Sequence, residues 1–217
     1  MKNSHIQKTI NFVKNELKNA ESGHDWFHIE RVYHNTKLIA KHEKVDLFTV
    51  ELAALLHDIA DSKFHGGDET IGPKKAKDFL DTLQIDQPII EHIINIIANM
   101  SFSKSLGNDV KFNSLELQVV QDADRLDAIG AIGIARTFNY GGYKNRTIYN
   151  PKIKPNINQS KEAYKKSTAP TINHFYEKLL LLKDKMNTNT GKIIAIKRHE
   201  FMELFLEQFY AEWNGER

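Results

Sequence analysis

The sequence predicts an all-α protein, because apolar residues recur with helical spacing almost throughout and no segment is convincing as a strand. Ile6, Ile10, Val13 and Leu17 show the pattern at the start of the chain. The isoleucine-rich stretch at 89–100 is the best strand candidate. Its length and its internal Glu91, His92 and Asn95 favour a helix instead.

The first half of the chain is expected to hold five helices, each bounded by turn-forming residues. After the first amphipathic helix, Ser22-Gly23 interrupts the helical spacing of apolar residues. The third helix is apolar on several sides at 52–56, which predicts a central, buried helix. Pro88 suits the first turn of the fifth. The second to fifth helices are expected at about 25–42, 47–58, 68–83 and 88–99.

The second half is expected to be helical apart from one long loop. Two consecutive helices run from about 115 to 138, and two more at about 160–186 and 190–213 are separated by a TNTG stretch. Residues 139–158 combine glycine, proline and positive charge without a period, so we expect a long loop, of a kind that is often functional. No composition shift marks a boundary, and we expect one multi-helix domain over 1–217.

The composition excludes several classes of function. The chain has no cysteine, which excludes disulfides and thiolate chemistry and fits a cytoplasmic protein. Its net charge of +2 gives no general argument for nucleic acid or membrane as partner. No apolar run approaches the roughly 20 residues of a membrane span, and the start has no secretory signal core.

The pair His57-Asp58 is the first candidate for chemistry, because it ends a strongly apolar helix. A carboxylate beside an imidazole in such a setting is costly unless it is paired or bound to a metal. Taken alone, the pair fits two interpretations equally: Asp58 hydrogen-bonds or caps a neighbouring group, or both side chains are metal ligands.

Two further segments favour the metal interpretation. His28 lies on a helix whose other positions face the core, and 122–127 place three acids in an apolar helix. A divalent cation would offset the repulsion between these carboxylates. Histidine and carboxylate ligands suit Mn²⁺, Ni²⁺, Co²⁺, Fe²⁺, Zn²⁺ or Mg²⁺, and the two nitrogens favour a transition metal.

The motifs HIERV, LLHDIAD and DADRLDAIG, in this order and spacing, resemble those of the HD superfamily of metal-dependent phosphohydrolases. The resemblance covers 24–127 and implies an HD-type helical bundle onto which helices at 160–213 pack. Carried over by position, it implies that His28, His57, Asp58 and Asp124 bind one metal ion.

The resemblance also narrows the ligand set. It selects Asp124 over Asp122, which we expect to be a surface acid or an indirect partner of the site. Relatives that bind two or three metal ions use extra, closely spaced histidines between the histidine–aspartate pair and the last aspartate. Here the only histidines in that interval, His65 and His92, are not closely spaced, and Met100 stands where some relatives have a histidine. We therefore expect one metal ion.

The catalytic and substrate-binding residues are expected near the histidine–aspartate pair and in the basic loop. A general acid or base is needed close to the metal-activated water. Asp61 is the first choice, since guanosine-tetraphosphate hydrolases of this superfamily carry an acid there, and Glu69 is the second; a loop-capping role for Asp61 stays open. Candidate substrate-binding residues, each with the alternative of a solvated surface residue, are His24, Lys63, Arg125, Lys144 and Arg146. His24 and Asp25 also suit a role in orienting His28.

These expectations give a function and its alternative. The resemblance implies hydrolysis of a phosphoanhydride or phosphomonoester, with a nucleotide as the expected substrate. The alternative is a non-catalytic HD domain that senses a nucleotide or a metal. A nucleic-acid-binding role rests only on the basic loop and is the weakest interpretation. The sequence leaves the particular phosphate compound, the metal and the formation of a homodimer open.

Overall fold

The computed structural model describes residues 1–20, 23–60, 68, 70–100, 112–157 and 167–216. Over these residues the protein is helical and contains no strand, which confirms the expected all-α class. The chain divides into two compact units, Met1–Asp124 and Arg125–Arg217. The prediction of one domain with the C-terminal helices packed onto the core stays a prediction. Among the described residues, no helix is long and apolar enough to cross a membrane.

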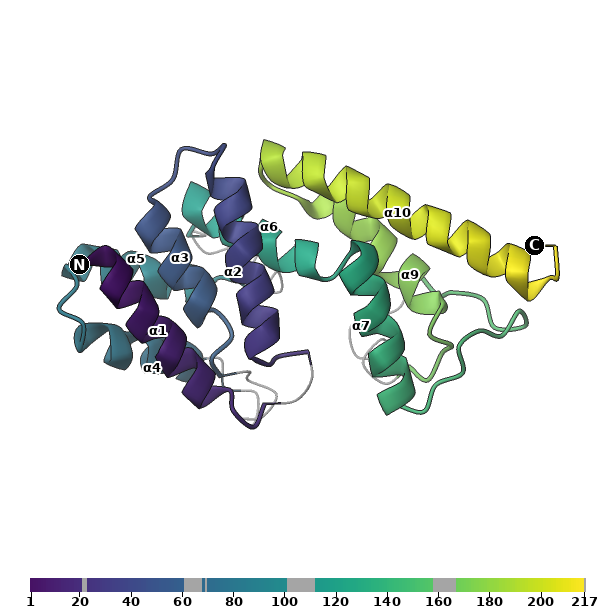
Figure 1. Cartoon of the computed structure of the whole chain (residues 1–217), viewed down its shortest axis with the longest axis horizontal. Coiled ribbons are helices and arrows are strands. Elements are labelled where there is room, and N and C mark those ends of the chain that lie inside the picture. Colours follow the sequence, from purple (N-terminus) through teal and green to yellow (C-terminus); the bar gives the residue numbers. More distant parts are fainter. Residues whose placement is uncertain (21–22, 61–67, 69, 101–111, 158–166, 217) are drawn as a thin grey trace. The chain divides into compact units, whose positions relative to one another are not determined.

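The first unit is built around α3 (Figure 1). Residues 52–56 are completely buried, and α1, α2 and α5 all pack against this helix. The central position predicted from its apolar sequence is therefore confirmed. The helices of this unit are α1 (Lys2–Glu16), α2 (Trp26–Ala40), α3 (Leu47–Leu56), α4 (Ile71–Asp81) and α5 (Gln87–Ala98), and α6 (Leu115–Asp127) continues into the second unit.

Aspartate side chains begin two of these helices. The carboxylate of Asp25 accepts a hydrogen bond from the backbone N–H of His28, at 3.0 Å, and Asp46 does the same for Thr49, at 2.8 Å. Each bond satisfies a backbone donor that has no partner within the helix. The Asp25 cap therefore fixes the start of α2 one turn before the His28 side chain.

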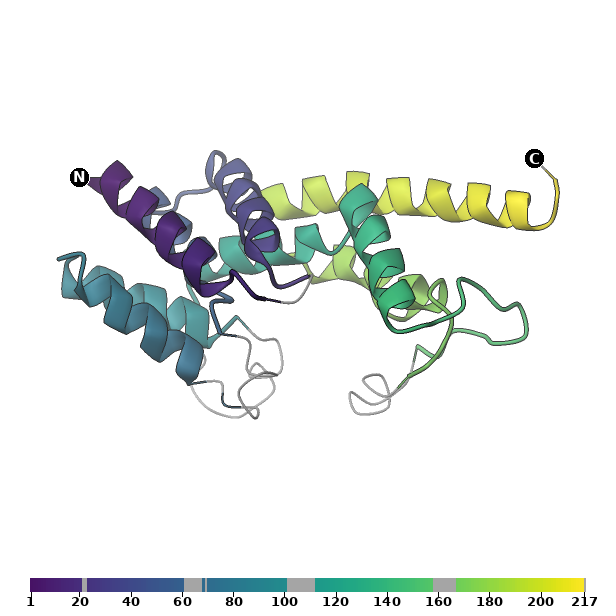
Figure 2. The same ribbon diagram turned by 60° about the horizontal axis from the view of Figure 1, so that its bottom comes forward.

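The second unit consists of the end of α6, then α7 (Gly130–Tyr143), α9 (Asn173–Glu177), the 3₁₀ helix η3 (Leu179–Lys185) and α10 (Asn189–Trp213). Helix α10 packs against α7 and η3 (Figure 2). The expected single helix over 160–186 is wrong: 167–172 are not helical, and α9 and η3 are short and distinct. Pro170 lacks a backbone N–H and disfavours helix in the residue before it.

The loop expected from residue 139 begins later, because α7 extends to Tyr143. Of the two glycines that suggested a loop, Gly141 allows close packing of α7 against Thr171. A Cβ placed on Gly141 would lie 2.2 Å from Oγ1 of the buried Thr171, so only glycine permits this approach. Gly142, next to it, has open space around the same position.

This difference predicts that alanine substitutions at the two neighbouring glycines change the free energy of unfolding in different directions. We expect Gly141→Ala to lower the free energy of unfolding by about 1–3 kcal/mol, because the new methyl group overpacks the contact with Thr171. Gly142→Ala, the matched control, should be neutral or stabilising by up to about 1 kcal/mol, since alanine favours helix. Urea unfolding followed by circular dichroism measures both. Equal stability of the two variants would contradict the packing role of Gly141.

Candidate metal centre

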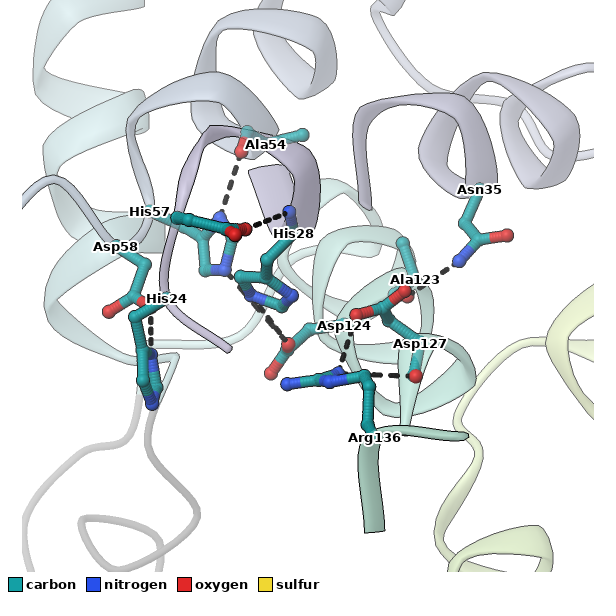
Figure 3. Close-up of polar contacts among 11 residues, drawn as sticks. His24, His28, Asn35, Ala54, His57, Asp58, Ala123, Asp124, Asp127 and Arg136 are labelled. Atoms are coloured by element: carbon teal, nitrogen blue, oxygen red, sulfur yellow. Dashed lines mark hydrogen bonds and ion pairs between the residues drawn. The ribbon is translucent and has the colours of Figure 1, made fainter. Parts of the chain in front are cut away.

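Four of the predicted residues meet in the first unit (Figure 3). His28 comes from α2, His57 caps the C-terminus of α3, Asp58 follows it, and Asp124 comes from α6. Nε2 of His28 lies 3.6 Å from Oδ1 of Asp124, and Nε2 of His57 lies 4.0 Å from the same oxygen. Two consecutive helices, α2 and α3, and the distant α6 thus direct these side chains to one place.

The geometry and donor chemistry of this cluster fit a metal ion. One potential ligand atom from each of His28, His57 and Asp58 lies within 4.8 Å of the others. Metal–nitrogen bonds of about 2.1 Å place ligand pairs roughly 3–4.2 Å apart, a range that includes both contacts to Asp124. Nδ1 of His57 donates to the carbonyl of Ala54, at 2.8 Å, which leaves its Nε2 lone pair available for a cation.

Asp58 is held in its anionic form. Burial acts to raise its pKa, but a hydrogen bond from His24 and the nearby imidazoles of His57 and His28 together keep the pKa below the ordinary 3.8. The bond joins Nδ1 of His24 to Oδ2 of Asp58, at 2.6 Å. A deprotonated carboxylate is the form that binds a cation, so the surroundings of Asp58 suit that role.

The sequence did not indicate the partner of His24. We expected His24 to orient His28 or to touch a phosphate, whereas in the structure its imidazole holds the carboxylate of Asp58, 34 positions later. The carboxylate of Asp25 contacts His28 at its backbone N–H, through the helix cap. Asp122 also differs from expectation: it is completely buried, which excludes a surface role. The sequence offered one signal of this burial: Asp122 stands close to the apolar residues Val119, Val120 and Ala123.

The remaining predicted residues lie elsewhere or outside the described residues. Asp61, Lys63 and Glu69 belong to the latter, so the catalytic assignments stay predictions. Lys144 and Arg146 lie together in the second unit, where Arg125 also belongs. His92, which we did not expect among the ligands, is 3.2 Å from the Ser114 hydroxyl and 3.5 Å from Glu116.

The contact between His24 and Asp58 makes a prediction of its own. His24→Ala should weaken metal binding by about 10–100-fold, the usual effect of removing a group that orients a ligand. His24→Asn should retain most of the affinity, because its amide N–H can replace Nδ1–H. Calorimetric titration of chelator-stripped protein with Mn²⁺ measures both.

The control is His34→Ala, which removes an exposed imidazole from the same helix, α2. Its metal affinity should equal that of the unchanged protein. If His24→Ala also binds Mn²⁺ with unchanged affinity, the hydrogen bond does not position Asp58.

Comparisons with known proteins agree in family and in fold. The model of the HD domain family matches residues 26–129. The Bacillus subtilis protein YpgQ is 39% identical over 205 residues, which cover 94% of this chain and 91% of that protein. A crystal structure of an HD-superfamily hydrolase from Bacillus thuringiensis is 47% identical, covers 99% of both chains and has a TM-score of 0.80. A structure of Bacillus subtilis YpgQ in complex with ADP has a TM-score of 0.75 at 35% identity, with 97% of this chain and 96% of that chain covered.

Proposed function

The chain belongs to the HD superfamily, and on that premise we propose that it is a metal-dependent phosphohydrolase acting on a nucleotide. The convergence of His28, His57, Asp58 and Asp124 carries the proposal, because two imidazoles and two carboxylates in contact form a ligand set for a divalent cation. A transition metal such as Mn²⁺ suits this set better than Mg²⁺, which prefers oxygen ligands.

Two of the four side chains, Asp58 and His57, have neighbours that hold them in place for binding the ion. Asp58 contributes negative charge and is kept in place by His24. His57 is fixed by its bond to the Ala54 carbonyl, so that its Nε2 is directed at the cluster. A divalent cation bound there supplies Lewis acidity, which lowers the pKa of a water molecule and offsets charge on a phosphate oxygen.

The proton transfers and the recognition of phosphate fall to the chain's own residues. We assign Asp61 as the general base that takes a proton from the attacking water, with Glu69 as the second candidate. Lys63 and Arg125 are assigned to neutralise phosphate charge. Little covalent work by the protein is needed in displacement at phosphorus, so positioning and charge account for most of the rate.

Two observations support a nucleotide as the substrate. YpgQ, which is similar to this chain over almost its whole length, has a structure in complex with ADP. In this chain, the exposed Tyr140 and Tyr143 lie beside Lys144 and Arg146, a combination of aromatic and cationic groups that suits a nucleotide.

The test is a product analysis. The purified protein, supplied with Mn²⁺, is incubated with nucleoside mono-, di- and triphosphates, and phosphate and pyrophosphate are measured separately. We expect release of one of these products from at least one nucleotide. The assay is repeated with Mn²⁺, Co²⁺, Ni²⁺ and Mg²⁺ in turn. If the protein binds nucleotides but releases neither product from any of them, the sensor interpretation replaces the enzyme interpretation.

A further inference from the structure

A buried amide joins the two helices that carry His28 and Asp124. Nδ2 of Asn35, on α2, donates to the backbone carbonyl of Ala123, on α6, at 3.2 Å (Figure 3). Both residues are buried, and 88 positions separate them in the sequence. Asn35 follows His28 by two helical turns and therefore lies on the same face of α2. Ala123 directly precedes Asp124, so the amide bond ends beside a candidate ligand.

An asparagine in this position is unfavourable unless its amide forms a hydrogen bond. Asn35 is buried inside α2, where asparagine favours a helix less than leucine or methionine does. Burying an amide without a hydrogen bond also costs free energy. The bond to Ala123 offsets this cost, because a carbonyl oxygen in a helix has a second lone pair beside the one that the helix uses. An apolar side chain of the same size could not supply this link between α2 and α6.

The position of Asp124 depends on its backbone more than the positions of the two histidines do. The side chain of Asp124 is 43% exposed, whereas those of His28 and His57 are 4% and 5% exposed. Surrounding atoms therefore restrict the two imidazoles closely and restrict the carboxylate less. The distance of 3.6 Å between Nε2 of His28 and Oδ1 of Asp124 is consequently set by where α6 lies relative to α2.

Side-chain contacts, more than a close approach of backbones, keep α6 in this place. Helices α2 and α3 approach each other closely, whereas within the described residues α6 makes no comparably close approach to another helix. Nε2 of Gln121 donates to the carbonyl of Asn99, at 3.1 Å, where α5 ends. The residues just before Asp124 are thus linked to α5 by Gln121 and to α2 by Asn35, and the second link leads to the helix of His28.

We propose that Asn35 is a positioning residue of the metal centre, which sets the spacing between the helices of His28 and Asp124. The inference rests on the proposed metal-binding role of these two side chains and adds a residue outside the four ligands. Without the amide bond, α6 shifts relative to α2, and the carboxylate of Asp124 moves with it. A metal site tolerates only small departures from its ligand distances, so the ion is then bound more weakly.

The test is the Mn²⁺ affinity of the full chain after its metal has been removed with a chelator. Asn35→Leu keeps the size of the side chain and removes the amide. We expect this variant to bind Mn²⁺ about tenfold more weakly, the lower end of the usual effect of losing a group that orients a ligand. With Co²⁺ in place of Mn²⁺, the visible absorption of the bound ion should also change, because it reports the arrangement of the ligands. Calorimetry and absorption spectroscopy are the two measurements.

The matched control is Ile39→Val, which shortens a completely buried side chain one turn further along the same helix. It should lower the thermal unfolding midpoint, because the core loses a buried carbon, and leave the Mn²⁺ affinity and the Co²⁺ absorption unchanged. Unchanged Mn²⁺ affinity in Asn35→Leu overturns the proposal, as does an equal loss in Ile39→Val, which would indicate a general loosening of the fold. If Asn35→Leu does not fold, Asn35→Ser takes its place; its hydroxyl ends one atom short of the amide nitrogen, so Mn²⁺ binding should weaken too.

Hydrolysis distinguishes this inference from the proposed function. If no nucleotide is hydrolysed but Asn35→Leu binds Mn²⁺ more weakly, the positioning role stands and the enzyme assignment fails. If nucleotides are hydrolysed and the variant binds Mn²⁺ as tightly as the unchanged protein, the enzyme assignment stands and Asn35 has no positioning role. Absence of Mn²⁺ binding by the unchanged protein would overturn both.

Discussion

An Asp58→Asn variant is expected to keep its fold and to lose both its divalent metal and its hydrolytic activity. The amide has nearly the shape of the carboxylate but no negative charge, so the cluster loses an anionic ligand. Metal catalysis supplies several kcal/mol of stabilisation in the transition state, so turnover should fall by on the order of 10³-fold. Metal content after dialysis and turnover with Mn²⁺ are the two measurements.

The control for this variant is Asp78→Asn, which changes an exposed aspartate on α4 in the same unit. It should retain metal and turnover. If Asp58→Asn retains both as well, the candidate metal centre is assigned to the wrong residues.

The second large effect is expected at Asp61. Asp61→Asn should retain the metal ion, because Asp61 is not among the four proposed ligands, while turnover falls by about 10²–10⁴-fold through loss of the proposed general base. Calorimetry with Mn²⁺ and steady-state kinetics separate the two effects. Asp86→Asn, an exposed aspartate that precedes α5, is the control. A loss of metal in Asp61→Asn would make Asp61 a ligand, and unchanged turnover would remove it from catalysis.

Local signals in the sequence were sufficient for most helices of the first unit. The apolar run at 52–56 predicted the buried centre of α3, and aspartates stand at the starts of α2 and α3. These features act within one or two turns, so they can be recognised without knowing what packs nearby. The resemblance of the motifs around His28, His57, Asp58 and Asp124 to those of the HD superfamily then predicted which side chains meet.

Contacts between distant segments could not be predicted in this way. Nothing in the loop before α2 indicates that His24 reaches Asp58, because the contact depends on how α2 and the end of α3 pack. The glycines at 141–142 resemble a loop signal, yet Gly141 is required by a close approach of Thr171, 30 positions later. The break in the expected helix at 160–186 had a local signal instead, because Pro170 disfavours helix in the residue before it and the short elements α9 and η3 follow it.

The most direct test of the proposal that this chain is a metal-dependent phosphohydrolase is removal and restoration of the metal. The protein is stripped with a chelator, dialysed, and assayed against nucleoside triphosphates and diphosphates before and after addition of Mn²⁺. The account predicts no hydrolysis by the stripped protein, full recovery on restoring the ion, and binding of one Mn²⁺ per chain through the cluster of His28, His57, Asp58 and Asp124. Hydrolysis at an undiminished rate by the metal-free protein would contradict it.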